Sequence, residues 1–334
     1  MIDFRYHLVS IVAVFLALAI GIVLGSTELR GAALSALDRT SSALSTKLNA
    51  ANTENSSLQQ QVNGDKAFAQ AAEPVLLAHL LDGKRAVIVT APAAPAGVVN
   101  GITTALTDAG ASVSGQVALT TKFADTAGSN LSLLNQLTQQ VTPSGMTLAN
   151  GSPQLQAAQV LASAILSSSA QPGSHSGTGQ SSQSAQTILQ SYAQGGFLTV
   201  SGQPASGATL AVIVTPATPP ADGNSDPANQ AIVSLATELG PASEAAVVAG
   251  ASSASGPGTA ISAVRASGAA NDASTVDNAD AVSGQIVTVQ ALERQVNGHK
   301  PASYGTQPDA SSDGPSPAPT PSASGSTTSA KGKK

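Results

Sequence analysis

An uninterrupted apolar run near the N-terminus constrains the fold more than any other feature of the chain. Residues Leu8–Leu24 read LVSIVAVFLALAIGIVL, which is 17 residues with no charge and one Ser. A helix of this length is about 26 Å long, near the short end of what crosses the hydrocarbon core of a bilayer. Phe4 and Tyr6 lie where aromatic residues meet the membrane interface. We therefore predict a single-pass membrane anchor within residues 1–26.

Two other interpretations of this run stay open at the level of sequence. A cleaved signal peptide is the first, because Arg5 supplies a positively charged start and Val23-x-Gly25 a small-residue cleavage site. The apolar region is longer than in most signal peptides, so an uncleaved anchor is favoured. A buried core helix is disfavoured, because no other segment is comparably apolar. The flanking charges, Arg5 before the run and Arg30 and Arg39 after it, do not decide its orientation.

The segment that follows the run has coiled-coil spacing. From Thr27 to about Val62, apolar residues recur at alternating steps of three and four, and Ser41 and Asn55 complete the series. Asn55 falls at an a position, where a polar residue can fix register and oligomeric state. We predict a coiled-coil stalk over residues 27–63 that joins parallel chains into a homo-oligomer and reaches roughly 55 Å from the membrane. The alternative is an amphipathic helix packed on its own domain. The apolar members are Leu34, Leu37, Leu44, Leu48, Ala51, Leu58 and Val62.

From residue 85 onward, short apolar runs alternate with helical patterns. Continuous β-branched runs such as Arg85–Thr90 (RAVIVT) predict buried strands. Alternation of such strands with helices is typical of an α/β fold, in which helices cover both faces of a mostly parallel sheet. The other predicted strands are Ser112–Leu119, Phe197–Val200, Leu210–Thr215, Ala245–Ala249 and Ser274–Val276. The predicted helices are Gly97–Ala109, Asn130–Gln140, Gln154–Ser168, Ala185–Ala193, Asn229–Leu239, Gly258–Ala266 and Ala281–Val296.

We assign this α/β domain to residues 85–306. A flexible linker rich in Gly, Ser and Gln is predicted at 169–184, and a disordered tail rich in Pro, Ser and Gly at 307–334. The sequence contains one short internal similarity: Ala86–Pro95 (AVIVTAPAAP) resembles Ala211–Pro220 (AVIVTPATPP). It indicates either duplicated halves or two buried strands that share the same residue preferences.

Composition excludes several classes of function. The net charge is −5 and the basic residues are few and scattered, so we expect no nucleic-acid partner. Cysteine is absent, which removes disulfides, thiolate metal sites and Cys nucleophiles. The phosphate-binding motifs GxGxxG and GxxxxGK[ST] and the hydrolase motif GxSxG are also absent, so we predict that the chain is not an enzyme and needs no cofactor.

Metal-binding residue types are sparse and dispersed. Copper prefers thiolate, thioether and imidazole ligands. The four histidines and two methionines form no pair three or four residues apart, so they predict no copper site. These residues are His7, His79, His175, His299, Met1 and Met146.

A single cluster of carboxylates lies in the predicted domain. Asp272, Asp277 and Asp280 fall at a strand-to-helix junction, which is the edge where open parallel sheets bind ligands. They are therefore weak candidates for a polar or cation-binding site. The structural interpretation is that Asp277 or Asp280 caps the following helix and that Asn278 makes the turn.

Both ends of the chain resemble one protein family. The opening MIDFRYHLVSIVAVFLALAIGIVLGST and the segment Ser274–Gly305, STVDNADAVSGQIVTVQALERQVNGHKPASYG, resemble the MctB family, actinobacterial proteins described as copper transporters of the mycobacterial cell envelope. The resemblance covers about residues 1–306. It implies copper efflux and copper homeostasis at the cell envelope, with copper as the transported ion. It also implies an uncleaved single-pass anchor in the cell membrane, an extracytoplasmic domain and a link to the outer envelope. It supplies no ligand residues.

Physical constraints leave two functional hypotheses. One helix cannot enclose a channel, so a helical pore would need four or more copies, and Leu8–Leu24 has no polar stripe to line it. The first hypothesis is a copper transport protein that acts as an oligomer. The second is a membrane-anchored coiled-coil scaffold or adaptor, which contacts membrane lipid and envelope protein partners without transporting copper directly.

Overall fold

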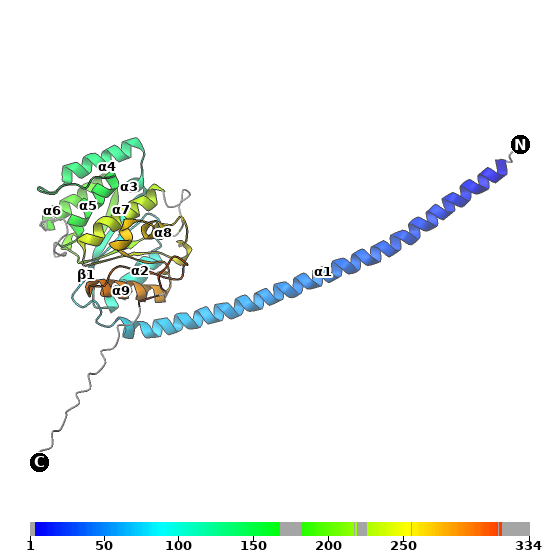
Figure 1. Ribbon diagram of the computed structural model, residues 1–334, viewed down its shortest axis with the longest axis horizontal. Coiled ribbons are helices and arrows are strands. Elements are labelled where there is room, and N and C mark those ends of the chain that lie inside the picture. Colours follow the sequence, from blue (N-terminus) through cyan, green and yellow to red (C-terminus); the bar gives the residue numbers. More distant parts are fainter. Residues whose placement is uncertain are drawn as a thin grey trace, which may run out of the picture. The chain divides into compact units, whose positions relative to one another are not determined.

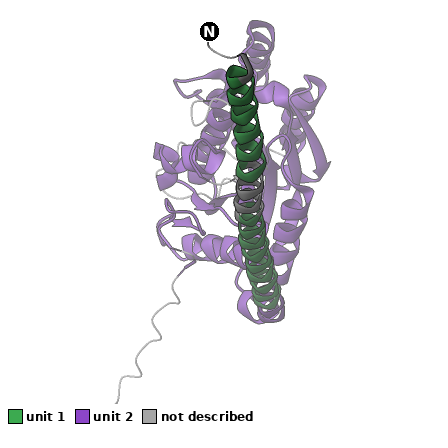
Figure 2. Cartoon of the chain, turned by 90° about the vertical axis from the view of Figure 1, so that its right-hand side faces the viewer, with its two compact units in different colours: residues 1–65 green, residues 66–334 purple. Residues whose placement is uncertain are grey.

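The computed structural model describes residues 4–167, 182–216, 218, 226–254, 256–312, 314 and 315, and gives the backbone alone at residues 4, 5, 26–34, 36 and 254. Two compact units divide the chain, residues 1–65 and 66–334 (Figure 2). Most of the predicted linker (169–181), the tail beyond residue 315 and the side chain of Leu34 lie outside what is described.

The first unit consists of the N-terminal part of helix α1. This helix runs from Phe4 to Leu77 over 74 residues, so the predicted apolar helix and the predicted stalk form one helix. Its segment Tyr6–Gly25 has a mean hydropathy of 2.9, and among the described residues it is the one stretch of helix long and apolar enough to cross a membrane. This confirms the prediction of an N-terminal apolar helix that continues into a long helix.

The second unit is built on a mixed sheet. Within the described residues, seven strands lie in the order β3-β2-β1-β4-β5-β6-β7. The edge strand β3 is antiparallel to β2, and every other neighbouring pair is parallel, which confirms the predicted mostly parallel α/β sheet. The strands are β1 (Arg85–Thr90), β2 (Ser112–Leu119), β3 (Leu198–Gly202), β4 (Leu210–Val214), β5 (Ala245–Ala249), β6 (Ser274–Val276) and β7 (Ser303–Tyr304).

Helices cover both faces of this sheet, and each face has its own apolar core. Helices α4 to α8 pack on one face and α2 and α9 on the other (Figure 1). Both cores consist mainly of Val, Leu, Ile and Ala, with Phe123, Tyr192 and Phe197 as large aromatic members of the first. The helices are α2 (Ala96–Asp108), α3 (Thr121–Ala124), α4 (Gly128–Val141), α5 (Pro153–Ile165), α6 (Ser182–Gln194), α7 (Pro227–Ala242), α8 (Ala260–Arg265) and α9 (Val282–Val296).

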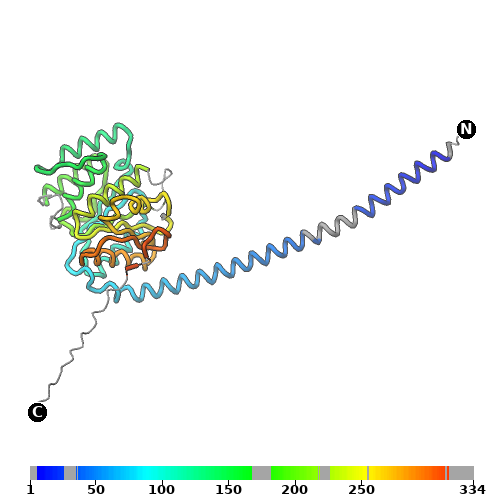
Figure 3. The backbone as a smooth tube through the Cα atoms, viewed as in Figure 1, coloured from blue at the N-terminus to red at the C-terminus, as the bar shows by residue number. Residues whose placement is uncertain are grey.

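Two predicted boundaries are wrong. Residues 182–184, assigned to the linker, begin helix α6. Residues 307–312, assigned to the disordered tail, pack beside β7. In Figure 3 this part of the chain is the orange to red end of the coloured tube. The Ser311 N–H donates to the Ser303 carbonyl at 2.7 Å, and the Gly305 N–H donates to the Ser312 carbonyl at 3.0 Å. Polar residues are ordered here because backbone hydrogen bonds, rather than apolar burial, hold the segment.

Candidate functional site

The carboxyl ends of β1 and β4 form the topological switch point of the sheet. The chain leaves β1 toward β2 on one side and leaves β4 toward β5 on the other, and open α/β sheets bind ligands where strand order reverses in this way. Thr90 ends β1 and Thr215 follows β4, and both are buried. The two AVIVT repeats thus belong to neighbouring parallel strands, paired Val87 with Ala211.

The residues described at the switch point offer hydrogen-bonding side chains. Gln116 Nε2 donates to Thr90 Oγ1 at 3.3 Å, whereas the buried Thr215 Oγ1 has no hydrogen-bond partner among the described residues. The residues next to the two threonines include Pro92 and Pro216, which have no backbone N–H to offer a phosphate. The Thr and Gln side chains described at this edge suit an uncharged polar contact.

Asp277, a predicted site residue, holds the C-terminal segment in place. It follows β6 and is fully buried, and Arg265 Nη2 lies 3.0 Å from its Oδ2 atom. The backbone N–H groups of Thr306 and Gln307 donate to the same carboxylate at 2.8 and 3.4 Å. At Gly305, φ is +135° and an added Cβ would lie 2.0 Å from Asp277 Oδ1, so only glycine fits there.

Arg265, the last residue of α8, is the centre of this arrangement. Its guanidinium also donates to Asp309 Oδ1 at 2.7 Å, Thr275 Oγ1 at 2.8 Å and the Tyr304 carbonyl at 2.9 Å. We name Arg265, Asp277 and Asp309 the C-terminal clasp. Sequence reasoning identified Asp277 and missed the other two members of the clasp, because they lie 12 and 32 positions away from Asp277 and nothing local marks the contacts.

The other two predicted site residues have separate surroundings. Asp280 Oδ1 accepts hydrogen bonds from the Ser252 N–H and hydroxyl, both at 2.8 Å, and so fixes the short 3-10 helix Ser252–Ala254. Burial raises the pKa of the Asp272 carboxyl. Within the described residues, no group of three or more His, Cys, Asp or Glu could hold a metal ion.

The helix after these carboxylates begins without a side-chain cap. Ala281 is the N-cap of α9, so the prediction that Asp277 or Asp280 caps this helix is wrong. Both carboxylates instead bind groups distant in the sequence. The Ala281 N–H donates to the Asn278 carbonyl at 3.0 Å, which confirms the predicted turn at Asn278.

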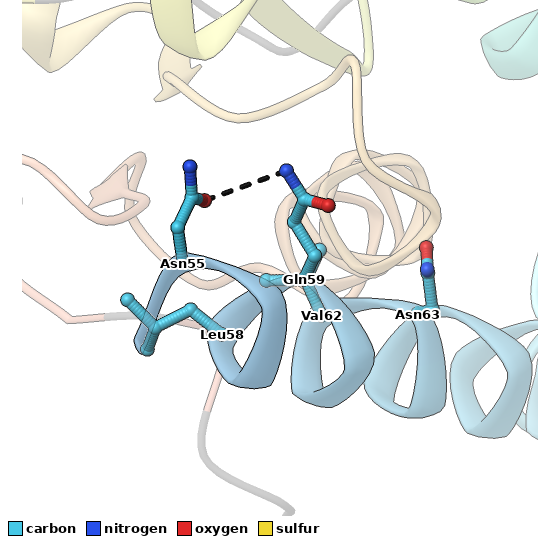
Figure 4. Close-up of a pocket in the computed structure, with 5 residues that line it drawn as sticks. All are labelled: Asn55, Leu58, Gln59, Val62 and Asn63. Carbon is cyan, nitrogen blue, oxygen red and sulfur yellow. Dashed lines mark hydrogen bonds between the residues drawn. The ribbon is translucent and has the colours of Figure 1, made fainter. Parts of the chain in front are cut away.

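The stalk carries a second candidate site, an open hollow on α1. Asn55, Leu58, Gln59, Val62 and Asn63 line it, and Gln59 Nε2 donates to Asn55 Oδ1 at 3.4 Å (Figure 4). The leucines and the valine of the heptad series whose side chains are described are more than half exposed, among them Leu37 at 67%, Leu44 at 66% and Leu58 at 54%. The sequence predicted this seam but not the hollow within it.

An apolar N-terminal helix, an exposed heptad seam and a doubly wound sheet define a membrane-associated α/β protein. The family described as "Copper transport outer membrane protein, MctB" matches residues 1–315, and the chain belongs to this MctB family. Proteins named copper transporter MctB from Mycobacterium tuberculosis (strain H37Rv) and Mycobacterium bovis are 30% identical over 314 residues, covering 92% of this chain and 96% of theirs. The protein of that name from Mycobacterium leprae is 29% identical over 322 residues, covering 93% and 98%.

Proposed function

We propose that the chain serves copper efflux and copper homeostasis at the cell envelope, with copper as the transported ion. The observation that carries this proposal is the family match, which extends over residues 1–315 and therefore includes the membrane helix, the stalk and the α/β domain together. The relatives bear the name copper transporter over nearly their whole length.

In this proposal α1 is an uncleaved, single-pass anchor in the cell membrane, and the α/β domain lies outside the cytoplasm. The family description refers to an outer membrane, which supports an extracytoplasmic domain that acts toward the outer envelope. The segment Tyr6–Gly25 meets the length and hydropathy of a span and continues without a break into the stalk. Its lipid contacts make membrane lipid the first partner of the chain.

In this proposal copper does not pass through the membrane-spanning helix of a single chain. A single helix encloses no channel, and Tyr6–Gly25 presents apolar side chains around its circumference rather than a polar stripe. The proposal therefore includes a homo-oligomer, assembled through the stalk, or further envelope protein partners. It includes no catalytic step, because the switch point between β1 and β4 offers neutral hydrogen-bonding groups.

The second candidate function is a membrane-anchored scaffold or adaptor that affects copper only through its partners. One observation favours it: the exposed seam of the stalk presents leucines and a valine, which bind other helices and not metal ions. The two candidates differ in what the cell loses when the chain is deleted.

A deletion strain tests the copper proposal directly. We expect it to accumulate copper, measured by mass spectrometry per milligram of cell protein, and to stop growing at a lower external copper concentration. The intact gene should restore both properties, and cell zinc, measured in the same samples, should not change. A deletion strain with normal copper content and normal copper tolerance would exclude the transport function and leave the scaffold.

A further inference from the structure

The stalk has a binding face that is ready for another helix. Its apolar seam lies along one side of α1, with Leu44 66%, Leu48 59%, Leu58 54% and Val62 63% exposed. Exposing such a row of leucines to water is unfavourable by about 1.5–3 kcal/mol for each fully exposed side chain, compared with burial. A seam of this kind therefore requires a covering partner.

The hollow on this seam shows what kind of side chain the partner contributes. In the heptad of the stalk, Asn55 is an a position, Leu58 a d position, Gln59 an e position and Val62 the next a position. Four residues of one helix form the hole that receives a knob from the facing helix. In a parallel coil, residues a, d, e and the following a surround the knob at a d position. Those are four of the five residues that line the hollow (Figure 4).

We infer that the stalks of two copies pair as a parallel, in-register, two-stranded coiled coil, in which Leu58 of each copy fills the hollow of the other and the two Asn55 side chains face each other. This inference rests on the proposed function in one respect, the membrane attachment, which sets the orientation. The span Tyr6–Gly25 precedes the stalk on the same helix, so a parallel pair has both spans at one end and an antiparallel pair has them at opposite ends.

The positions of Leu and Asn argue for two strands. Leucine at d, as at Leu37, Leu44 and Leu58, together with a single Asn at a, favours a dimer over a trimer or tetramer. The Asn55 amide now receives a hydrogen bond from Gln59 and can exchange it for one with the second copy's Asn55. The next d position is Asp65, where the first unit ends, so the seam stops at the unit boundary.

The absence of cysteine makes a clean cross-linking test possible in the full-length chain. We expect Leu58→Cys and Leu44→Cys each to form disulfide-linked dimers in membranes treated with the oxidant diamide. Gln60→Cys, an exposed f position on the far side of the same helix, is the matched control and should give at least tenfold fewer dimers. Equal cross-linking at all three positions would overturn the inference.

Mixed pairs test orientation and register. When Leu44→Cys and Leu58→Cys chains carry tags of different length and are coexpressed, a parallel in-register coil gives no mixed dimer, because the two positions lie about 21 Å apart along the helix. Mixed dimers without either symmetric dimer would show an antiparallel pair and overturn the inference. Asn55→Leu, added to both chains, should allow mixed dimers to form, and their continued absence would show that Asn55 does not fix the register. Copper content of the cells plays no part in these readouts, so the coil and the copper function fail independently.

Discussion

The C-terminal clasp makes the sharpest prediction about stability. Replacing Arg265 by Leu removes the guanidinium that faces Asp277, a carboxylate with 0% exposure. Removing one partner of a buried ion pair leaves an uncompensated charge, which costs about 3–5 kcal/mol. For domains of 150–250 residues, each kcal/mol lowers Tm by about 2–4 °C. We therefore expect Arg265→Leu to lower the Tm of the α/β domain by about 6–20 °C.

Thermal unfolding of the full-length chain in detergent, followed by circular dichroism, measures this change. Lys84→Met is the matched control, because the side chains of the Lys84–Glu244 pair are 29% and 27% exposed, so water screens the charge left behind more than it does at the fully buried Asp277. The double variant Arg265→Leu with Asp277→Leu removes both charges and should recover part of the lost stability. If Arg265→Leu lowers the Tm no more than Lys84→Met does, the ion pair between Arg265 and Asp277 does not stabilise the domain.

Four further predictions concern local features. The raised pKa of Asp272 means that its ionisation costs stability as pH rises above the usual value of 3.8, so Asp272→Asn should be more stable than the native chain at pH 7, by no more than about 0.5 kcal/mol, and equally stable in acid, by urea unfolding at both pH values. Gly284→Ala should lose about 1–3 kcal/mol in the same assay, because its Cβ would lie 2.0 Å from a backbone carbonyl oxygen. Tyr192→Phe should lose about 0.5–1.5 kcal/mol, because its hydroxyl lies 2.9 Å from Thr138 Oγ1 in the core. Gln139→Cys, exposed on α4, should react with a membrane-impermeant maleimide in wall-stripped intact cells, and reaction only after lysis would reverse the proposed topology.

A two-stranded stalk would restrict where the copper path can lie in this family member. Two apolar spans cannot surround a water-filled path, so a dimer excludes a pore built from the N-terminal helices alone. Copper export would then depend on partner proteins or on the α/β domains of the assembled chains. In that case the chain would be the scaffold of a complex whose other members transport copper, and both candidate functions would apply to that complex.

The strands were predictable because their signal is local. β1, β2, β5 and β6 begin and end at the residues expected from the sequence, and β1 and β5 have the clearest signal because each is a short run of mostly apolar residues. β7 was not predictable, because Ser303–Tyr304 has no strand pattern of its own and forms only by pairing with β6. The antiparallel direction of β3 is likewise set by its partner β2 and not by its residues.

Part of the candidate site was likewise predictable from the sequence, and part depends on contacts between distant segments. The position of Asp277 after a strand follows from the sequence, but its role depends on Arg265 and on backbone groups about 30 positions further on. The carboxylate cluster is close in sequence and separate in space, since Asp277 and Asp280 bind different segments. In contrast, the exposed seam from Leu37 to Val62 was predictable as one face of a helix, because heptad spacing determines which side chains share a face.

We propose that α1 both anchors and pairs the chain, and the mass of the detergent-solubilised full-length protein tests the pairing most directly. Native mass spectrometry should give twice the 32.7 kDa of one chain, and Leu58→Asp should give a monomer while Gln60→Asp stays dimeric. A native chain that is monomeric at micromolar concentration would contradict this pairing. A tetramer or larger assembly would also contradict it and would restore the helical pore.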